Sequence, residues 1–192
     1  NDTATVAKGT LTENKLGISA TGNNSFGYFA GGWAPGYRTT IDRLDYGSDT
    51  TNAVAKGPLD TARSELTSVS NSSYAYFIGG STPSTISSIE RFDFSNDTAE
   101  AVVKGPLTIT KYGSSAAGND DYGYVAGGSS PTVSIVWRID YASDSSDAVV
   151  KGPVTRVARQ MGGTGNKSYG YFAGGEDSPG DKTWIDRVDY SN

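Results

Sequence analysis

A motif of about 48 residues occurs four times along this chain of 192 residues. Successive double glycines lie 48, 48 and 47 residues apart, at Gly31-Gly32, Gly79-Gly80, Gly127-Gly128 and Gly174-Gly175. A Lys-Gly pair recurs with the same spacings, at Lys8, Lys56, Lys104 and Lys151. Fixed periodicity of this length indicates a repeat architecture, in which each repeat is one supersecondary unit that packs on its neighbours.

Each repeat contains four short strand-like runs separated by turn residues. In the first full repeat, strands A, B and C are expected at residues 16–22, 26–32 and 41–46, and strand D carries the Lys-Gly ending. The 25 glycines and the lack of a long apolar pattern with a period of about 3.6 predict almost no helix. We therefore predict an all-β fold, a four-bladed β-propeller whose blades are four-stranded antiparallel sheets.

The chain begins with a strand D and ends with a strand C, because NDTATVAKG at residues 1–9 matches the segments that follow strand C elsewhere. We predict a single propeller domain over residues 1–192, with strands A to C of the closing blade at about 158–190. Residues 1–9 are predicted to pair with residues 185–190, which would close the ring and cover two sheet edges. A monomeric closed ring is favoured, and two chains that share one eight-bladed ring are the alternative.

An asparagine follows each predicted strand A, and we interpret it as a hairpin residue with positive φ. The four positions are Asn23, Asn71, Asn119 and Asn166. The segments after strand C, GSDTTN, SNDTAE and ASDSSD, are interpreted as turns in which Asp or Asn caps local backbone amides.

Every strand C carries an arginine and an aspartate two residues apart, which places both side chains on one face of the strand. The pairs are Arg43 with Asp45, Arg91 with Asp93, Arg138 with Asp140, and Arg187 with Asp189. A catalytic role would require four equivalent active sites. We therefore interpret these positions, like the double glycines, as structural, in internal ion pairs or hydrogen bonds.

The chain has no cysteine and no histidine. Ordinary Ser-His-Asp and Cys-His catalytic arrangements and a conventional zinc site are therefore excluded. Sixteen basic residues stand against 21 acidic ones without a basic cluster, which argues against a nucleic-acid partner. No apolar run approaches the roughly 20 residues of a membrane-spanning helix. We expect no enzymatic activity, no cofactor and no membrane insertion.

Segments such as SSYAYFIGG, followed by SSIERFDFSNDTAEAVVKGPL, resemble kelch repeats, whose hallmarks are a double glycine after an aromatic strand and an ERYDP-like strand beyond it. The resemblance covers all four repeats and implies a β-propeller. It departs from kelch in the last strand, where Trp is usual and this chain has Ala53, Ala101 or Ala148, and kelch propellers usually have more blades. The motifs GYFAGG and IDRxDYSNDTA are similar to repeats in virion structural proteins of large tailed marine phages. This resemblance implies a tail- or fibre-type role.

The connection between strands B and C varies in length and composition among the repeats, reading WAPGYRTT, STPSTISS, SSPTVSI and EDSPGDKTW. Variation on a repeated scaffold is typical of a display surface. In the first of these B–C loops, Trp33, Tyr37 and Arg38 are a candidate binding platform, because these residue types are enriched in binding hot spots. The alternative is that Trp33 folds back over the edge of its blade.

The fourth B–C loop carries the other candidate binding residues, Glu176, Asp177, Asp181 and Lys182. Its carboxylates provide the oxygen ligands that calcium prefers, although their spacing is not that of an EF-hand. The alternative is that they are solvated loop carboxylates without a metal.

The sequence favours a non-enzymatic structural or recognition module of a phage virion or tail-fibre assembly, in a virion or extracellular setting. Its B–C loops are expected to bind a protein or glycan surface. An extracellular lectin-like propeller and a glycan-hydrolysing propeller are alternatives, since carboxylate, Tyr and Arg groups are available for chemistry. A further alternative is an excised or engineered repeat block without independent function, because the chain lacks an initial methionine and contains four complete repeat lengths.

Overall fold

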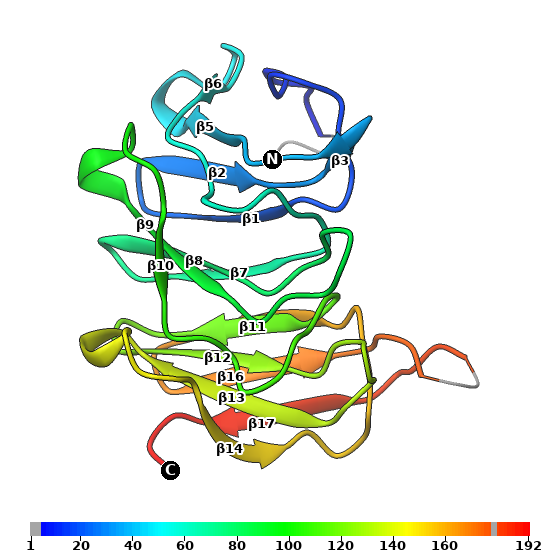
Figure 1. The fold of residues 1–192 in the computed structure, drawn as a ribbon. Helices are drawn as coiled ribbons and strands as arrows, with labels where there is room; N and C mark the ends of the chain where they lie inside the picture. The colour runs from blue at the N-terminus through cyan, green and yellow to red at the C-terminus, as the bar shows by residue number, and fades with distance from the viewer. Residues whose placement is uncertain (1–4, 178–179) are drawn as a thin grey trace.

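The computed structural model describes residues 5–177 and 180–192 and contains four antiparallel sheets arranged as a four-bladed β-propeller (Figure 1), which confirms the predicted fold class. Blade 1 contains β1 (Ser19–Gly22), β2 (Phe26–Ala30), β5 (Ile41–Asp45) and β6 (Val54–Ala55). Blade 2 contains β7 (Thr67–Ser70), β8 (Tyr74–Ile78), β9 (Ile89–Asp93) and β10 (Val102–Lys104). Blade 3 contains β11 (Ser115–Gly118), β12 (Tyr122–Ala126), β13 (Ile135–Asp140) and β14 (Val149–Pro153). Blade 4 contains β15 (Gly162–Gly165), β16 (Tyr169–Ala173) and β17 (Ile185–Asp189).

The innermost strands of successive blades lie beside one another and are joined by small hydroxyl side chains. Ser19 Oγ lies 2.6 Å from Ser68 Oγ, and Thr21 Oγ1 donates to Ser70 Oγ at 2.7 Å. Ser70 Oγ in turn donates to the carbonyl oxygen of Gly22 at 2.9 Å. Small residues in the predicted A strands therefore allow the sheets to approach one another closely.

The turn between strands A and B is closed by the asparagine side chain, and the predicted positive φ is wrong. None of the four asparagines is among the positive-φ residues of the described chain. Instead, Asn23 Oδ1 accepts hydrogen bonds of 2.9 Å from the backbone N–H groups of Ser25 and Phe26. The same side-chain cap recurs at Asn71, Asn119 and Asn166. The carboxamide thus satisfies the turn amides without requiring left-handed backbone.

A short 3₁₀ turn follows strand C in three blades, at η1 (Tyr46–Ser48), η2 (Phe94–Asn96) and η3 (Tyr141–Ser143). Each is capped by the aspartate of the Arg-x-Asp pair. Asp45, for example, accepts from the N–H of Gly47 at 2.8 Å. No helix in the described part of the chain is long and apolar enough to cross a membrane.

In blades 1 and 2, the arginine of this pair contacts the next blade. Arg43 Nη1 lies 2.5 Å from a carboxylate oxygen of Asp97, and Lys56 Nζ lies 3.1 Å from the other oxygen. The Tyr28 hydroxyl donates to the same carboxylate at 3.3 Å. Tyr, Arg and Lys of blade 1 therefore converge on one Asp of blade 2, an arrangement that we call the aspartate clasp.

A second aspartate clasp joins blades 2 and 3. Arg91 and Lys104 lie 2.9 and 3.2 Å from the Asp144 carboxylate, and the Tyr76 hydroxyl donates to it at 3.1 Å. The segments interpreted from sequence as locally capped turns therefore supply aspartates to the preceding blade. This role extends beyond local capping, because each carboxylate compensates two cations from another sheet.

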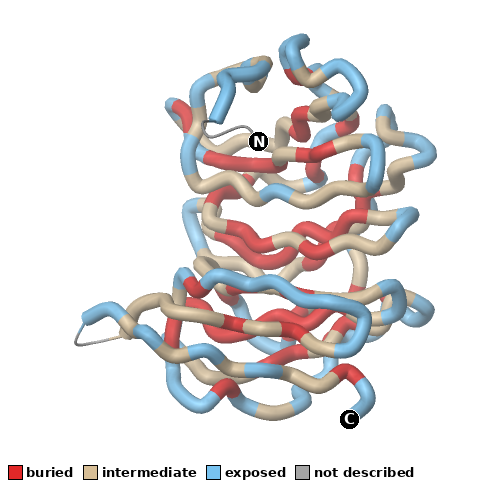
Figure 2. The backbone as a smooth tube through the Cα atoms, turned by 180° about the vertical axis from the view of Figure 1, so that it is seen from behind, coloured by how far each residue is buried: buried red, intermediate tan, exposed pale blue. Residues whose placement is uncertain are grey.

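Three hydrophobic clusters fill the junctions between blades 1 and 2, 2 and 3, and 3 and 4. Figure 2 shows buried residues concentrated between the stacked sheets. A stacked aromatic pair lies in each junction, with ring centroids 4.6–4.9 Å apart. The pairs are Tyr28 with Phe94, Tyr76 with Tyr141, and Tyr124 with Tyr190. The core is thus built of inter-blade layers, to which strand B supplies much of the apolar surface.

The predicted pairing of residues 1–9 with residues 185–190 is not found in the described residues. Residues 5–9 form no strand, and β17 pairs only with β16, so blade 4 has three strands. Lys8 instead pairs with Asp49 at 3.2 Å, and the Gly9 N–H donates to the Asp49 carbonyl. The Lys-Gly ending at residues 8–9 is thus attached to blade 1. Residues 1–4 lie outside the described residues.

Tyrosines in the junctions between blades have raised pKa values, so we expect the folded protein to lose stability at high pH. Burial, with the charge of Asp97, raises the pKa of Tyr28 to about 12, and burial beside Tyr124 raises the pKa of Tyr190 to about 12. An unfolded tyrosine has a pKa of about 10. Because the folded pKa values are raised, their stabilising contribution is complete below about pH 10 and is lost as the pH rises toward 12.

We expect the free energy of unfolding in urea to be level up to about pH 9 and to fall between about pH 10 and 12. The variant Tyr28→Phe removes one of the buried tyrosines whose pKa is raised, so its free energy of unfolding should fall less steeply over that interval. A wild-type profile that stays level to pH 12 would contradict the burial of these hydroxyls.

Candidate functional site

The B–C loops of the four blades gather on one side of the molecule, at the right in Figure 1. In blade 1 this loop contains a small hairpin, β3 (Trp33–Ala34) and β4 (Gly36–Tyr37), in which Trp33 is opposite Tyr37. Their rings meet edge to face with centroids 4.8 Å apart. The Trp33 residue is 42% exposed. The hairpin therefore presents Trp33 to solvent, with the half-buried Tyr37 packed against its ring.

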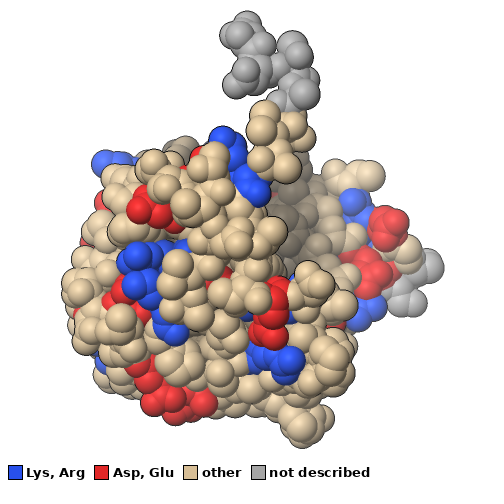
Figure 3. Space-filling model, turned by 90° about the horizontal axis from the view of Figure 1, so that it is seen from above, with Lys and Arg blue, Asp and Glu red and all other residues tan. Residues whose placement is uncertain are grey.

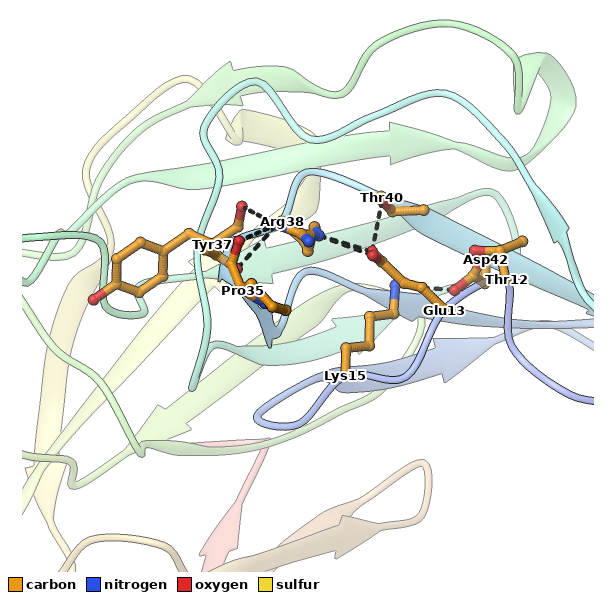
Figure 4. Close-up of polar contacts among 9 residues, drawn as sticks. Thr12, Glu13, Lys15, Pro35, Tyr37, Arg38, Thr40 and Asp42 are labelled. Carbon is orange, nitrogen blue, oxygen red and sulfur yellow. Dashed lines mark hydrogen bonds and ion pairs between the residues drawn. The ribbon is translucent and has the colours of Figure 1, made fainter.

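Arg38 fixes this hairpin to the rest of blade 1, as Figure 4 shows. Its guanidinium Nε donates to Glu13 Oε2 at 2.9 Å, and Nη1 donates to the Gly36 carbonyl oxygen at 3.1 Å. A further contact of 3.4 Å reaches the Pro35 carbonyl. The guanidinium is thus occupied by internal partners, and its observed contacts brace the loop.

A shallow apolar hollow of about 430 Å³ adjoins the aromatic pair. Leu16 and Trp33 exchange two backbone hydrogen bonds, with N···O distances of 3.0 and 2.8 Å. Leu16 is 66% exposed, and Ala34 and Pro35 complete the apolar lining beside Trp33. We call Leu16, Trp33, Pro35 and Tyr37 the aromatic platform. Sequence reasoning took Leu16 as the first residue of strand A and missed its place in this surface, because it lies 17 residues from Trp33 and β1 begins only at Ser19.

A basic side chain from the crossing before strand A is buried in each of blades 1 to 3. Lys15 pairs with Asp42 at 2.9 Å, with both side chains fully buried, and Arg63 pairs with the buried Glu90. In blade 3, Trp137 replaces the acidic residue that Asp42 and Glu90 provide in blades 1 and 2. Burial lowers the pKa of Lys111, the basic residue of this blade. The Lys111 ammonium donates to the carbonyl oxygens of Pro131 and Ser129, at 2.5 and 3.5 Å. These buried cations tie the variable loops to the scaffold.

The fourth B–C loop borders a polar groove of about 510 Å³ shared with the loop of blade 3. Glu176 forms an ion pair with Arg159, and Glu176 and Asp181 pair across the loop as an isolated bridge. Asp177 lines the groove, whereas Asp181 and Lys182 line a smaller neighbouring hollow. In residues 5–177 and 180–192, no group of three acidic side chains is arranged to hold a metal ion.

The two predicted groups of binding residues are not brought together. Trp33, Tyr37 and Arg38 belong to blade 1, whereas the loop of Glu176 belongs to blade 4, and these blades are the first and last of the stack in Figure 1. They therefore form two separate surfaces on the loop side of the protein. Of the two, only the blade 1 loop presents an exposed tryptophan.

A larger hollow, of about 830 Å³, lies on the opposite side, where the A–B turns of all four blades meet. Asn23, Asn71, Asn119 and Asn166 line it together with Lys167 and Asp120. The fourfold asparagine was the sequence signal for this hollow, but we interpreted it only as turn chemistry. Because the asparagine oxygens cap the turns, the recurring side chains are explained by the scaffold.

Acidic and basic side chains are interspersed on the face seen from above in Figure 3, without one large area of a single sign. This distribution agrees with the formal net charge of −5 and provides no basic track for a phosphate backbone on that face. No family model matches the chain, and no curated protein matches it either.

Proposed function

We propose that this propeller is a non-enzymatic recognition module that binds a protein or glycan surface through its B–C loops. The observation that supports the proposal is the aromatic platform of blade 1. Its rings meet edge to face at 4.8 Å, and Leu16 beside them is 66% exposed. Tryptophan and tyrosine combine a large apolar area with few rotatable bonds, so they bind at a low entropic cost.

The bracing of the loop adds support. Arg38 joins Glu13 to the Gly36 carbonyl, so the hairpin that carries Trp33 is held in place before a ligand arrives. Preorganisation of this kind raises affinity because less conformational entropy is lost on binding. An exposed tryptophan beside apolar side chains suits the apolar face of a sugar ring or an aliphatic side chain of a protein partner.

The setting that we propose is a virion or extracellular one, with the chain as a structural part of a phage tail or fibre. That part of the proposal rests only on the resemblance of the repeat motifs to those of phage virion structural proteins. The absence of histidine and cysteine and the repetition of Arg and Asp in every blade favour recognition over catalysis.

Binding to an array of glycans, and to intact host cells for protein receptors, tests the proposal. We expect Trp33→Ala to weaken the binding of any ligand found by about tenfold to a hundredfold, as for the loss of a hot-spot aromatic residue. Val149→Ala is the matched control, because it trims an exposed apolar side chain of the outer strand β14, where 54% of Val149 is exposed. Equal binding by Trp33→Ala and wild type, or release of a cleaved glycan, would overturn the proposal.

A further inference from the structure

The capping role of the asparagines at the A–B turns explains their side-chain oxygens but not their side-chain nitrogens. Each Oδ1 accepts hydrogen bonds from two backbone N–H groups of its own turn, which fixes the carboxamide. Among the described residues, only the Nδ2 group of Asn119 has a partner, the Lys167 carbonyl oxygen at 3.2 Å. The hollow of about 830 Å³ that these turns line, which we call the asparagine hollow, therefore carries three carboxamide groups with N–H donors to spare, those of Asn23, Asn71 and Asn166.

Capping alone does not require asparagine. The same chain caps the 3₁₀ turns after strand C with aspartate, and Asp45, Asp93 and Asp140 each accept from the N–H group two residues further on, at 2.8–3.0 Å. A carboxylate oxygen and a carboxamide oxygen serve such a cap equally well. What asparagine adds is an NH₂ donor and the absence of charge. Its use in all four A–B turns puts donors into the hollow where aspartates would have put four negative charges.

The residue after each of these asparagines differs from repeat to repeat and also lines the hollow. The four residues are Asn24, Ser72, Asp120 and Lys167. Asp120 and Lys167 belong to neighbouring turns and are both exposed, yet neither forms an ion pair with a described residue. Variable polar side chains beside a constant ring are typical of a binding surface on a repeated scaffold.

Donor groups outnumber acceptor groups in the lining. The carboxamide nitrogens and the Lys167 ammonium only donate, Asp120 only accepts, and the hydroxyl groups of Ser25 and Ser72 can do both. Such a lining suits a ligand rich in acceptor oxygens. A carboxylate offers two acceptor oxygens and forms charge-assisted hydrogen bonds with N–H donors. Hydroxyl groups on the same ligand would satisfy Asp120.

The lining is held in place before a ligand arrives. Ser70 Oγ donates to the Gly22 carbonyl oxygen at 2.9 Å and so joins the turns of blades 1 and 2. Asn119 Nδ2 joins the turn of blade 3 to that of blade 4 through Lys167. Preorganised donors bind with a smaller loss of conformational entropy. The volume of the hollow is that of a small-molecule site and accommodates a sugar ring.

We propose that the asparagine hollow binds a sugar acid, a sugar ring that carries a carboxylate. The carboxylate accepts hydrogen bonds from the Lys167 ammonium and from asparagine Nδ2 groups, and the ring hydroxyls bond to Asp120 and to the serines of the turns. This site goes beyond the proposed function, because it lies on the side of the propeller opposite the B–C loops and uses none of their residues.

Titration of the ¹⁵N-labelled full chain with glucuronate tests this inference, with the asparagine NH₂ signals in ¹H–¹⁵N spectra as the readout. Glucose has the same ring without the carboxylate, and acetate has the carboxylate without the ring. We expect glucuronate to shift the NH₂ signals of the hollow. Glucose and acetate should each bind about tenfold more weakly or less, because each lacks one of the two sets of hydrogen bonds.

Two variants place the site. Lys167→Gln removes the cation, and Asn71→Asp replaces an NH₂ donor by a carboxylate oxygen while keeping the oxygen that caps the turn. Each should raise the dissociation constant for glucuronate by about tenfold or more. Ser73→Ala, on an exposed residue of the same turn outside the lining, is the matched control and should leave it unchanged. Trp33→Ala, on the other side of the protein, should also leave it unchanged.

Three results would overturn the inference. The first is the absence of any shift of the asparagine NH₂ signals at millimolar glucuronate. The second is an equal affinity for glucuronate and either glucose or acetate, since a site for any sugar or any anion would not be a sugar-acid site. The third is an affinity that falls in Trp33→Ala and not in Lys167→Gln, which would assign the sugar to the aromatic platform. Because the Lys167 side chain is exposed, Lys167→Gln remains informative even where Asn71→Asp alters the fold.

Discussion

Replacing Gly105 by alanine is expected to lower the free energy of unfolding by about 3 kcal/mol or more, as for severe overpacking. The Gly105 N–H donates to the Asp144 carbonyl at 2.9 Å, so the two backbones run in close contact between blades 2 and 3. An added Cβ would lie 1.9 Å from the Ser146 carbonyl oxygen. Because this neighbour is backbone, relief requires the blades to separate. Urea unfolding followed by circular dichroism measures the loss.

Gly152→Ala is the matched control for Gly105→Ala. Both glycines follow the lysine of a Lys-Gly ending, but Gly152 has open space where its Cβ would be. Its unfolding midpoint should equal that of wild type within error. Equal losses in the two variants would mean that the glycines serve strand D itself and not the contact between blades.

Asp144→Asn is expected to cost about 3 kcal/mol, because it leaves two cations without their carboxylate. The Asp144 side chain is buried and holds Arg91, Lys104 and the Tyr76 hydroxyl. The amide keeps the shape and one acceptor oxygen, so the loss reports the charge. The control Asp147→Asn removes an exposed carboxylate three residues away and should change the free energy by no more than about 0.5 kcal/mol. A loss in Asp144→Asn as small as that of the control would contradict the role of the clasp.

The strands were predictable because their signals are local. The run FGYFAGG is rich in aromatic residues and ends at two glycines, and β2 indeed ends at Ala30. Gly31 and Gly32 then adopt φ values of +65° and +109°, which a side chain would oppose. The structural part of each repeat could therefore be placed from spacing and turn chemistry alone.

The contacts between blades could not be predicted in the same way. Period two places Arg43 and Asp45 on one face of a strand, but it does not identify partners. The partner of Arg43 is Asp97, 54 residues along the chain, whereas Asp45 caps the 3₁₀ turn that follows it. A clue was available in the aspartates that recur at positions 49, 97 and 144 with the period of the lysines.

The candidate site was predictable only in part. Divergence of the B–C loops singled out Trp33 and Tyr37, whose rings do meet edge to face, with Trp33 exposed. Arg38 was grouped with them for its residue type, yet Glu13 and the loop carbonyls engage it. Glu13 lies in an irregular segment that has no repeated pattern to mark it. Contacts made by such segments depend on the folded geometry and not on any local periodicity.

A double-mutant cycle between Arg91 and Asp144 tests most directly the central claim that aspartate clasps hold blade 1 to blade 2 and blade 2 to blade 3. The unfolding free energies of wild type, Arg91→Gln, Asp144→Asn and the double variant give the coupling between the two side chains. The clasp, with 2.9 Å between Arg91 and Asp144, is expected to give a coupling of about 1.5 kcal/mol or more. Additive losses, with a coupling below about 0.5 kcal/mol, would contradict the account.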